Sequence, residues 1–113
     1  MKEFVAVFRN VRGLLSDPLH WTKHALARVS RYFPVAVDHK DANCFCMIGA
    51  FHRVCGDNIL RGRALSMVRD EINNGVRGTE LAISDWNDSP NRTHADVLQL
   101  LDKLIAKCEN ADV

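Results

Sequence analysis

The sequence predicts an α+β fold that is predominantly α-helical, with about four helices around a buried central helix and a small β-hairpin. Three observations predict it. Apolar residues recur at helical spacing in several separate stretches. Between the first two of these stretches lie two short runs typical of strands. The 113 residues hold no repeat, low-complexity tract or long linker, so we expect a single domain over residues 1–113.

The first helix is expected over about residues 3–15, where apolar side chains follow the i, i+3, i+4, i+7 rule up to a break at "SDP". The hairpin is expected over about residues 21–37. Its first strand alternates in "WTKHALARV", and its second, "PVAV", is rich in β-branched residues. Pro34 should lie at a strand start or on an edge, because proline donates no hydrogen bond to a sheet.

The buried central helix is expected over about residues 41–55, because its apolar residues surround almost the whole cylinder. Asp41 or Asp38 would cap its start. Gly49 and Ala50 leave a bare patch on this helix, where another backbone can approach closely.

A third helix is expected over about residues 58–73, with one apolar face and a stop at "NNG". Residues 79–86 are compatible with either a short helix or a strand. The last helix begins near Thr93, which forms the pattern of a capping box with Asp96. The polar tail over residues 109–113 is expected to fray.

Composition excludes several classes of protein. Hydrophobic residues make up 47% and charged residues 26%, as in ordinary globular proteins. The net charge of +1 gives no reason to expect nucleic acid as a partner. No stretch approaches the roughly 20 apolar residues that span a bilayer, and the start of the chain lacks a signal-peptide core. We therefore expect a cytoplasmic protein that does not bind membranes and whose cysteines are reduced.

The segment "NCFCMIGAFHRVCG" holds three of the four cysteines and a histidine, which suggests a metal site. On a helix, however, Cys44 and Cys46 point to nearly opposite sides, and Cys44 lies ~16 Å from Cys55 along the axis. Only His52 and Cys55 could reach one ion together, whereas structural zinc needs four ligands. Bridged cysteines need Cα atoms under about 7 Å apart, which excludes a disulfide within the segment. We therefore predict buried thiols, with no metal and no cofactor.

Cysteine catalysis is another interpretation of the same segment. A thiol near a helix start has a lowered pKa, although Asp38 and Asp41 would act against this. A thiol nucleophile also needs a base and an orienting group. We assign no catalytic residue, and the candidates are Cys46, His94 and Asp88, in a spacing that matches no nucleophile signature.

Two polar stretches supply candidate ligand-binding residues. They are Trp21 and Lys23 in "HWTKH", and Trp86 and Asn87 in "SDWNDSPNRTH". In the structural interpretation of the second stretch, Trp86 anchors the core and Asn87 bonds to nearby backbone N–H groups. In the functional interpretation, Trp86 is a stacking platform beside a wet polar pocket at a helix start. Turn and cap chemistry accounts for most of these residues and favours the structural interpretation.

Three stretches together resemble a known family: "HWTKHALAR", "CFCMIGAFHR" and "WNDSPNRTHADVLQLLDKLI". The family is an uncharacterised domain-of-unknown-function family of small bacterial and phage proteins. Its members share three motifs that these stretches resemble, in the order W-T-x-x-A-x-A-R, C-x-x-G-A and W-N-D-x-P-x-R-T-H. Members often show an Asp-Gly-type turn after the first motif, where this chain has "VSRYFPV", so the hairpin geometry stays open. The resemblance implies an accessory gene without a known activity, and a family pattern that includes Cys46, Trp86, Asn87, Asp88, Thr93 and His94.

The main functional hypothesis is a small soluble accessory protein that acts inside the cell by protein–protein interaction or regulation. In one version it is linked to phages and directed at a host protein. This hypothesis predicts a protein partner or a homo-oligomer. It also predicts an exposed patch around Phe4, Phe8, Tyr32 and Phe33.

The alternative is a small enzyme or small-ligand binder. Its pocket would be formed by Cys46, Trp86, Asn87, Asp88 and His94. A third hypothesis is nucleic-acid binding through the third helix, whose arginines are interleaved with acidic residues.

Overall fold

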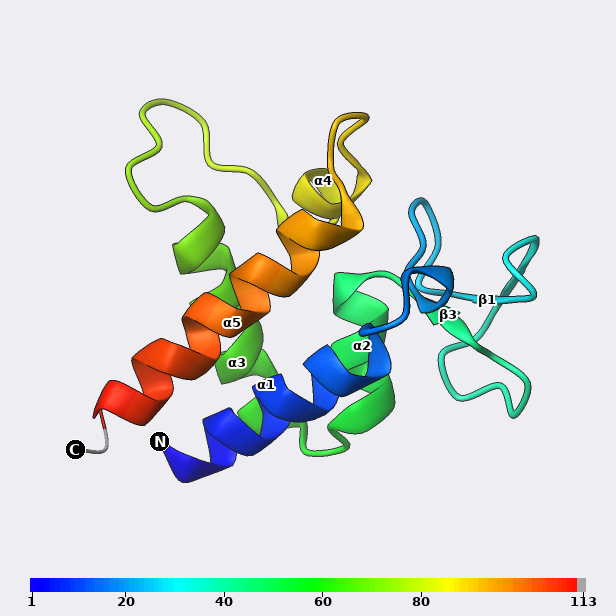
Figure 1. Ribbon diagram of the computed structural model, residues 1–113, viewed down its shortest axis with the longest axis horizontal. Helices are drawn as coiled ribbons and strands as arrows, with labels where there is room; N and C mark the ends of the chain where they lie inside the picture. The colour runs from blue at the N-terminus through cyan, green and yellow to red at the C-terminus, as the bar shows by residue number, and fades with distance from the viewer. Residues whose placement is uncertain (112–113) are drawn as a thin grey trace.

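Within residues 1–111, which the computed structural model describes, five α-helices accompany a small three-stranded antiparallel sheet (Figure 1). The helices are α1 (Lys2–Leu14), α2 (Met47–Val54), α3 (Asn58–Ile72), α4 (Ile83–Asp88) and α5 (His94–Ala111). The strands are β1 (Ala27–Val29), β2 (Phe33–Val35) and β3 (Cys44–Phe45), and a 3-10 turn, η1, covers Pro18–His20. The predicted α+β, predominantly helical class is confirmed, with five α-helices in place of about four.

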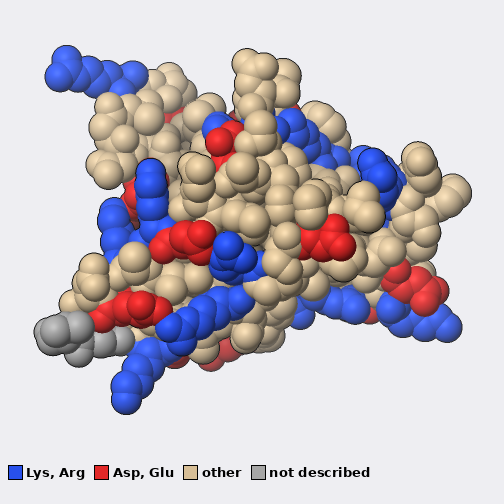
Figure 2. All heavy atoms as spheres, in the orientation of Figure 1, with Lys and Arg blue, Asp and Glu red and all other residues tan. Residues whose placement is uncertain are grey.

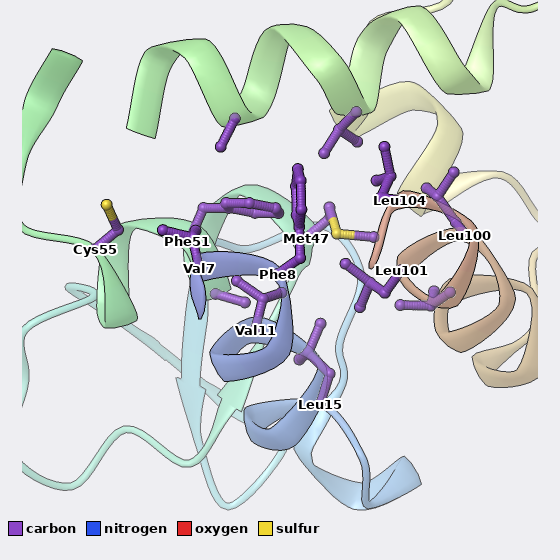
Figure 3. Close-up of a cluster of buried hydrophobic side chains, with 14 of the residues drawn as sticks. Val7, Phe8, Val11, Leu15, Met47, Phe51, Cys55, Leu100, Leu101 and Leu104 are labelled. Carbon is purple, nitrogen blue, oxygen red and sulfur yellow. The ribbon is translucent and has the colours of Figure 1, made fainter. Parts of the chain in front are cut away.

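The core lies where α1, α2 and α5 meet (Figure 3). Helix α1 runs beside α5, and its predicted apolar stripe faces inward through Val7, Phe8 and Val11. The ring of Phe8 meets the ring of Phe51 edge to face, with centroids 5.8 Å apart. Leu101 on α5 closes the cluster from the other side, with no exposed surface. The predicted periodicities of the first and last helices therefore build most of this core.

The central helix is shorter than predicted. Residues 41–55 do not form one helix, because Cys44 and Phe45 are the strand β3 and pair with Arg28 and Ala27 of β1. Helix α2 starts only at Met47, so neither Asp38 nor Asp41 caps it. Its cap is Cys46, whose sulfur accepts a hydrogen bond from the N–H of Gly49. The apolar run predicted one long helix, but here it supplies two consecutive elements.

The contact predicted at Gly49 is present. An added Cβ atom at this glycine would lie 1.9 Å from the carbonyl oxygen of Leu26. The same carbonyl accepts a hydrogen bond from the N–H of Cys46. The missing side chain therefore allows the strand-side loop to rest directly on α2.

The caps of the later helices follow local rules. Helix α3 begins after Asp57, whose carboxylate accepts from the N–H groups of Ile59 and Leu60. The predicted capping box of α5 is confirmed: Asp96 N–H donates to the Thr93 hydroxyl, and Thr93 N–H donates to the Asp96 carboxylate. The helix continues to Ala111, so residues 109–111 of the predicted polar tail are helical, and residues 112–113 lie outside the described part.

The sheet projects from one end of the helical body, with strand order β2-β1-β3 (Figure 1). The predicted hairpin is confirmed over a shorter range than 21–37, with Val29 opposite Phe33. Pro34 lies on the edge strand β2, as predicted. Lysine and arginine are interspersed with acidic residues on the face shown in Figure 2. No helix among residues 1–111 has the length and apolar character needed to cross a membrane.

Candidate functional site

Trp86, Asn87 and Asp88 form the end of the short helix α4, so residues 83–86 of the ambiguous segment are helical and residues 79–82 are neither helix nor strand. Helix α4 begins after Ala82, whose carbonyl accepts from the N–H of Trp86. It packs against α2 and α3 and carries Asn87 and Asp88 toward the strand side of the molecule. Two polar side chains thereby lie next to "HWTKH", more than sixty residues earlier in the chain.

Asn87 is completely buried and joins three segments of the chain. Its Oδ1 accepts hydrogen bonds from Trp21 Nε1 at 2.8 Å and from the backbone N–H of Met47 at 3.0 Å. Its Nδ2 donates to the carbonyl of Thr22 at 3.1 Å and to Asp88 Oδ1 at 2.9 Å. Both donors and both acceptor positions of the amide are thus occupied. Asn87 is therefore a structural hub, and its amide has no donor or acceptor position left for a ligand.

Asp88, Lys23 and His24 hold the two polar stretches together. Asp88 Oδ1 also accepts from the backbone N–H of His24 at 3.0 Å. Lys23 Nζ donates to the carbonyl of Ser89 at 2.7 Å and lies 5.5 Å from the centroid of the Trp21 ring. Trp21 and Lys23, predicted as ligand contacts, therefore make contacts within the fold.

His94 lies beside the Trp21 ring, with centroids 6.3 Å apart, whereas Trp86 packs elsewhere. His94 Nε2 lies 2.6 Å from the carbonyl oxygen of Leu15, which ties the start of α5 to the end of α1. The Trp86 ring is buried, and the guanidinium of Arg92 lies 3.9 Å from its centroid. Arg92 also donates to the Trp86 carbonyl, so the indole is covered from the side of α5.

Cys46 is 5% exposed, and its surroundings do not activate its thiol. Burial raises the pKa of the Cys46 thiol above its ordinary value, and the negative charge of Asp88 raises it further. Hydrogen bonds from the N–H groups of Gly49 and Ile48 act in the opposite direction but do not reverse the shift. The helix start thus fails to activate this thiol, because desolvation outweighs it.

The five side chains proposed for one pocket are distributed over several places. Cys46 and Asp88 line a common surface hollow, while Trp86 lines a different one between α3 and α5. The Asn87 amide is fully buried, and His94 bonds to the carbonyl of Leu15, directly after α1. Within residues 1–111, no group of three or more His, Cys, Asp or Glu side chains is arranged to hold a metal ion. The four cysteines, all in this part, form no disulfide.

The hollow beside Cys46 and Asp88 is also lined by His24 and Ser84. From the sequence, His24 is only one of several possible ligand contacts or bases, and nothing distinguishes Ser84. The Nδ1 atom of His24 lies 3.7 Å from Asp88 Oδ2. The two residues are 64 positions apart, and no spacing rule connects them. The only sequence signal is the second histidine of "HWTKH".

The hairpin tip is a second candidate site. Ser30 and Arg31 both have positive φ, at 53° and 72°, in a turn closed by a hydrogen bond from Tyr32 N–H to the Val29 carbonyl. Asparagine and glycine usually fill such positions. Tyr32 is 74% exposed and Phe33 is 65% exposed. The tip therefore presents two aromatic side chains on a strained turn.

Only half of the predicted patch around Phe4, Phe8, Tyr32 and Phe33 is at the surface. Phe8 is fully buried against Phe51, and Phe4 is partly buried at the edge of the core. Tyr32 and Phe33 remain, in the hairpin of β1 and β2, and Figure 1 shows β1 at the opposite end of the molecule from the N-terminus.

The comparisons identify a family but no activity. The model of a family described as "Family of unknown function (DUF6197)" matches residues 1–107. The chain therefore belongs to this family, and the predicted membership of a domain-of-unknown-function family is confirmed. No curated protein and no solved structure matches the chain significantly.

Proposed function

We propose that this member of the DUF6197 family is a small accessory protein that acts by binding another protein through its hairpin tip. One observation carries the proposal: Tyr32 and Phe33 are largely exposed on a turn that neighbouring side chains hold in place. Aromatic residues are enriched in protein interfaces, where they supply much of the binding energy. A monomer has no folding reason to leave two of them exposed side by side.

Two side chains fix the strained turn. The Oδ1 atom of Asn43 accepts from the N–H of Ser30 at 3.0 Å, and Arg28 donates to the Tyr32 carbonyl at 3.4 Å. A left-handed backbone costs roughly 1–2 kcal/mol for each residue other than glycine. Strain of this kind persists where the surrounding structure imposes it, and it occurs often in binding segments. A tip held in advance also loses little conformational entropy on docking.

The mode of binding that fits best is insertion of side chains rather than addition of a strand. The edge strand β2 carries Pro34 at its centre, opposite Arg28 of β1. Proline lacks an N–H group, so a strand added at this edge would find one donor missing. A suitable partner offers an apolar recess for Tyr32 and Phe33, with acidic groups near the exposed Arg31.

The proposal includes further expectations from the sequence. We propose that the protein is cytoplasmic and of bacterial or phage origin, and that it is directed at a host protein or assembles as a homo-oligomer. No feature of the described residues favours nucleic acid, since acidic and basic groups are interspersed on the surface shown in Figure 2.

The experiment places a photo-crosslinking amino acid at position 32 or, as a control, at position 59, in the cells that encode the protein. Ile59 is 71% exposed on α3 and lies outside the hairpin. We expect a discrete protein adduct from position 32 that disappears when Phe33→Ser is added. Equal adducts from both positions, or none from position 32, would contradict the proposal.

Analytical ultracentrifugation separates the two kinds of partner. If the occupant is a second copy, the wild-type chain self-associates and the Tyr32→Ser/Phe33→Ser variant is monomeric. If it is another protein, both sediment as monomers while the adduct carries a foreign mass. Both exposed substitutions should change the free energy of unfolding by less than about 0.5 kcal/mol, so a lost adduct would not reflect unfolding.

A further inference from the structure

A surface hollow lies where the loop before β1, the start of α2 and α4 meet, away from the hairpin tip. It offers about 200 Å³ of space. The residues that line it are His24, Ala25, Leu26, Cys46, Ser84 and Asp88. Clefts for drug-sized ligands measure roughly 300–1,000 Å³, so this hollow suits a smaller molecule.

The polar side of the hollow has unused hydrogen-bonding capacity. Asp88 Oδ1 is occupied by the N–H of His24 and by Asn87 Nδ2. Asp88 Oδ2 has only His24 Nδ1 nearby, at 3.7 Å, which is beyond hydrogen-bond distance. The Asp88 side chain is 27% exposed, so its charge is partly desolvated. The carboxylate therefore has one oxygen anchored by the fold and one available to a donor.

The remaining walls are apolar or neutral. Leu26 is held against Gly49, where no side chain fits, so this wall cannot collapse inward. The thiol of Cys46 has a pKa raised by burial, and at neutral pH it acts as a small apolar surface. Lys23 is engaged with the Ser89 carbonyl. The basic side chain beside Asp88 is His24, whose Nδ1 atom at 3.7 Å makes no hydrogen bond to the carboxylate.

The backbone around the hollow is fixed in advance. His24 has a φ of 67°, in the left-handed region that a non-glycine residue seldom adopts. The hydrogen bond from its N–H to Asp88 holds it there. Asp88 is in turn fixed by the buried amide of Asn87. A ligand would therefore meet a carboxylate whose position is set by the hub and not by solvent.

We propose that this hollow binds a small organic cation, namely a protonated primary amine with a short apolar chain. The ammonium group donates to Asp88 Oδ2 and to the Ser84 hydroxyl, and the carbon chain lies against Leu26 and Cys46. An anion is disfavoured by the Asp88 charge. A metal ion lacks the third ligand that it needs, since no such cluster exists within residues 1–111. The inference does not depend on the function proposed for the hairpin tip.

The first experiment is an NMR titration of the full chain with ethylammonium chloride, with ethanol and sodium acetate as neutral and anionic controls. The signals to follow are the side-chain amide of Asn87 and the backbone N–H groups of His24 and Gly49. A ligand with three heavy atoms cannot bind much more tightly than about 1 mM. We expect saturable shifts with ethylammonium in this range and none with acetate. Equal shifts with ethanol, or shifts confined to other acidic residues, would overturn the proposal.

The matched variants are Asp88→Asn and Asp85→Asn. Asparagine at position 88 keeps an oxygen for the N–H of His24 while it removes the charge. Asp85 is exposed on the same helix and does not line the hollow. We expect Asp88→Asn to weaken ethylammonium binding at least tenfold and Asp85→Asn to leave it within twofold. The reverse pattern, or equal loss in both variants, would contradict the assignment.

A second measurement uses the wild-type chain alone. Methanethiosulfonate reagents transfer an R–S group to a thiol: the Cys46 sulfur attacks the reagent sulfur, methanesulfinate leaves, and the thiol proton passes to buffer. The aminoethyl reagent is a cation and the sulfonatoethyl reagent an anion. The quantity compared is the ratio of the modification rates with the cationic and the anionic reagent, measured for Cys46 by mass spectrometry of its peptide and for glutathione as a reference. We expect this ratio to be at least tenfold higher for Cys46 than for glutathione. A ratio equal to that of glutathione, or no modification of Cys46 in the folded chain by the cationic reagent, would overturn the proposal.

Discussion

The helical body and the strand side of the molecule are held together in different ways. In the body, α1, α2 and α5 bury apolar side chains such as Phe8, Phe51 and Leu101, and many neighbours share each contact. On the strand side, a few polar side chains each join distant segments. Asn87 alone connects α4, the start of α2 and the loop before β1, and Arg28 connects that loop to the hairpin turn.

We therefore expect single substitutions to destabilise the two regions to different extents. A shortened side chain in the body removes part of a distributed apolar contact, and the neighbours relax. A lost hub leaves several buried donors and acceptors without partners at once. The strand side carries both candidate sites, and we expect that a single substitution at one of its polar residues is enough to destabilise it.

The largest effect is expected from Asn87→Ala. This change leaves the indole N–H of Trp21, the N–H of Met47 and the Thr22 carbonyl without their partner. We expect a loss of about 3–5 kcal/mol in the free energy of unfolding, measured by urea denaturation.

Hydrogen exchange tests whether that loss is regional. In Asn87→Ala, amides of residues 21–47 should lose protection before those of α1 and α5. The matched control is Asn91→Ala in the exposed turn before α5, with a change below about 0.5 kcal/mol. Uniform loss of protection over the whole chain would break the distinction between the two regions.

Gly49→Ala tests the backbone contact between the regions. The new methyl group would lie 1.9 Å from the Leu26 carbonyl oxygen, so backbone must move. We expect a loss of roughly 2–3 kcal/mol, although alanine is the better helix former. In Gly62→Ala on α3, where no atom lies within 4 Å, the same exchange should stabilise by about 0.5–1 kcal/mol. Both variants are measured by urea denaturation. A change of the same sign in the free energy of unfolding of both would contradict the close approach of Leu26 to Gly49.

A smaller effect is expected within the body, at the start of α5. Thr93→Ala removes the hydroxyl that accepts from the N–H of Asp96. The helix remains packed by Val97 and Leu101, so we expect a loss of about 1 kcal/mol in thermal or urea unfolding. A loss as large as that of Asn87→Ala would show that the body, too, depends on single polar residues.

The smallest effect concerns acid. The backbone N–H of Thr93 donates to the Asp96 carboxylate and holds its pKa below the ordinary value. A lowered folded-state pKa stabilises the protein above the unfolded-state pKa of about 3.9, and this stabilisation is lost as pH falls through the lower folded value. Asp96→Asn should therefore flatten the dependence of stability on pH below about pH 4, in unfolding measurements from pH 2 to 6. An unchanged slope would refute this role.

Much of the helical body could be predicted from the sequence. Period 3.6 patterns located α1, α3 and α5, and the capping box at Thr93 and Asp96 was readable because its partners are three residues apart. The apolar run over residues 41–55 led to the wrong prediction of one long helix. A run that is apolar on all sides is compatible both with one long helix and with a strand followed by a helix, and the structure has the second arrangement.

The strand side could be predicted only in part. Gly49 signalled a close approach, but not which backbone would approach. The roles of Asn87 and Asp88 depend on partners 40 to 66 residues away, and no local pattern encodes such pairs. Serine and arginine seldom adopt positive φ, so the sequence does not predict this conformation at Ser30 and Arg31. The hydrogen bonds made by Asn43 and Arg28 hold the turn in it.

The position of the hub late in the chain also sets an order of assembly. During synthesis, the indole N–H of Trp21 and the N–H of Met47 emerge long before residue 87, which is their acceptor. A nascent chain that has not yet released α4 can already pair β1 with β3 and rest Leu26 on Gly49 of α2, but the N–H groups of Trp21 and Met47 still lack their acceptor. The polar joint between α4, the start of α2 and the loop before β1 is therefore completed only after α4 has left the ribosome, whereas the residues that fix the hairpin tip are synthesised much earlier.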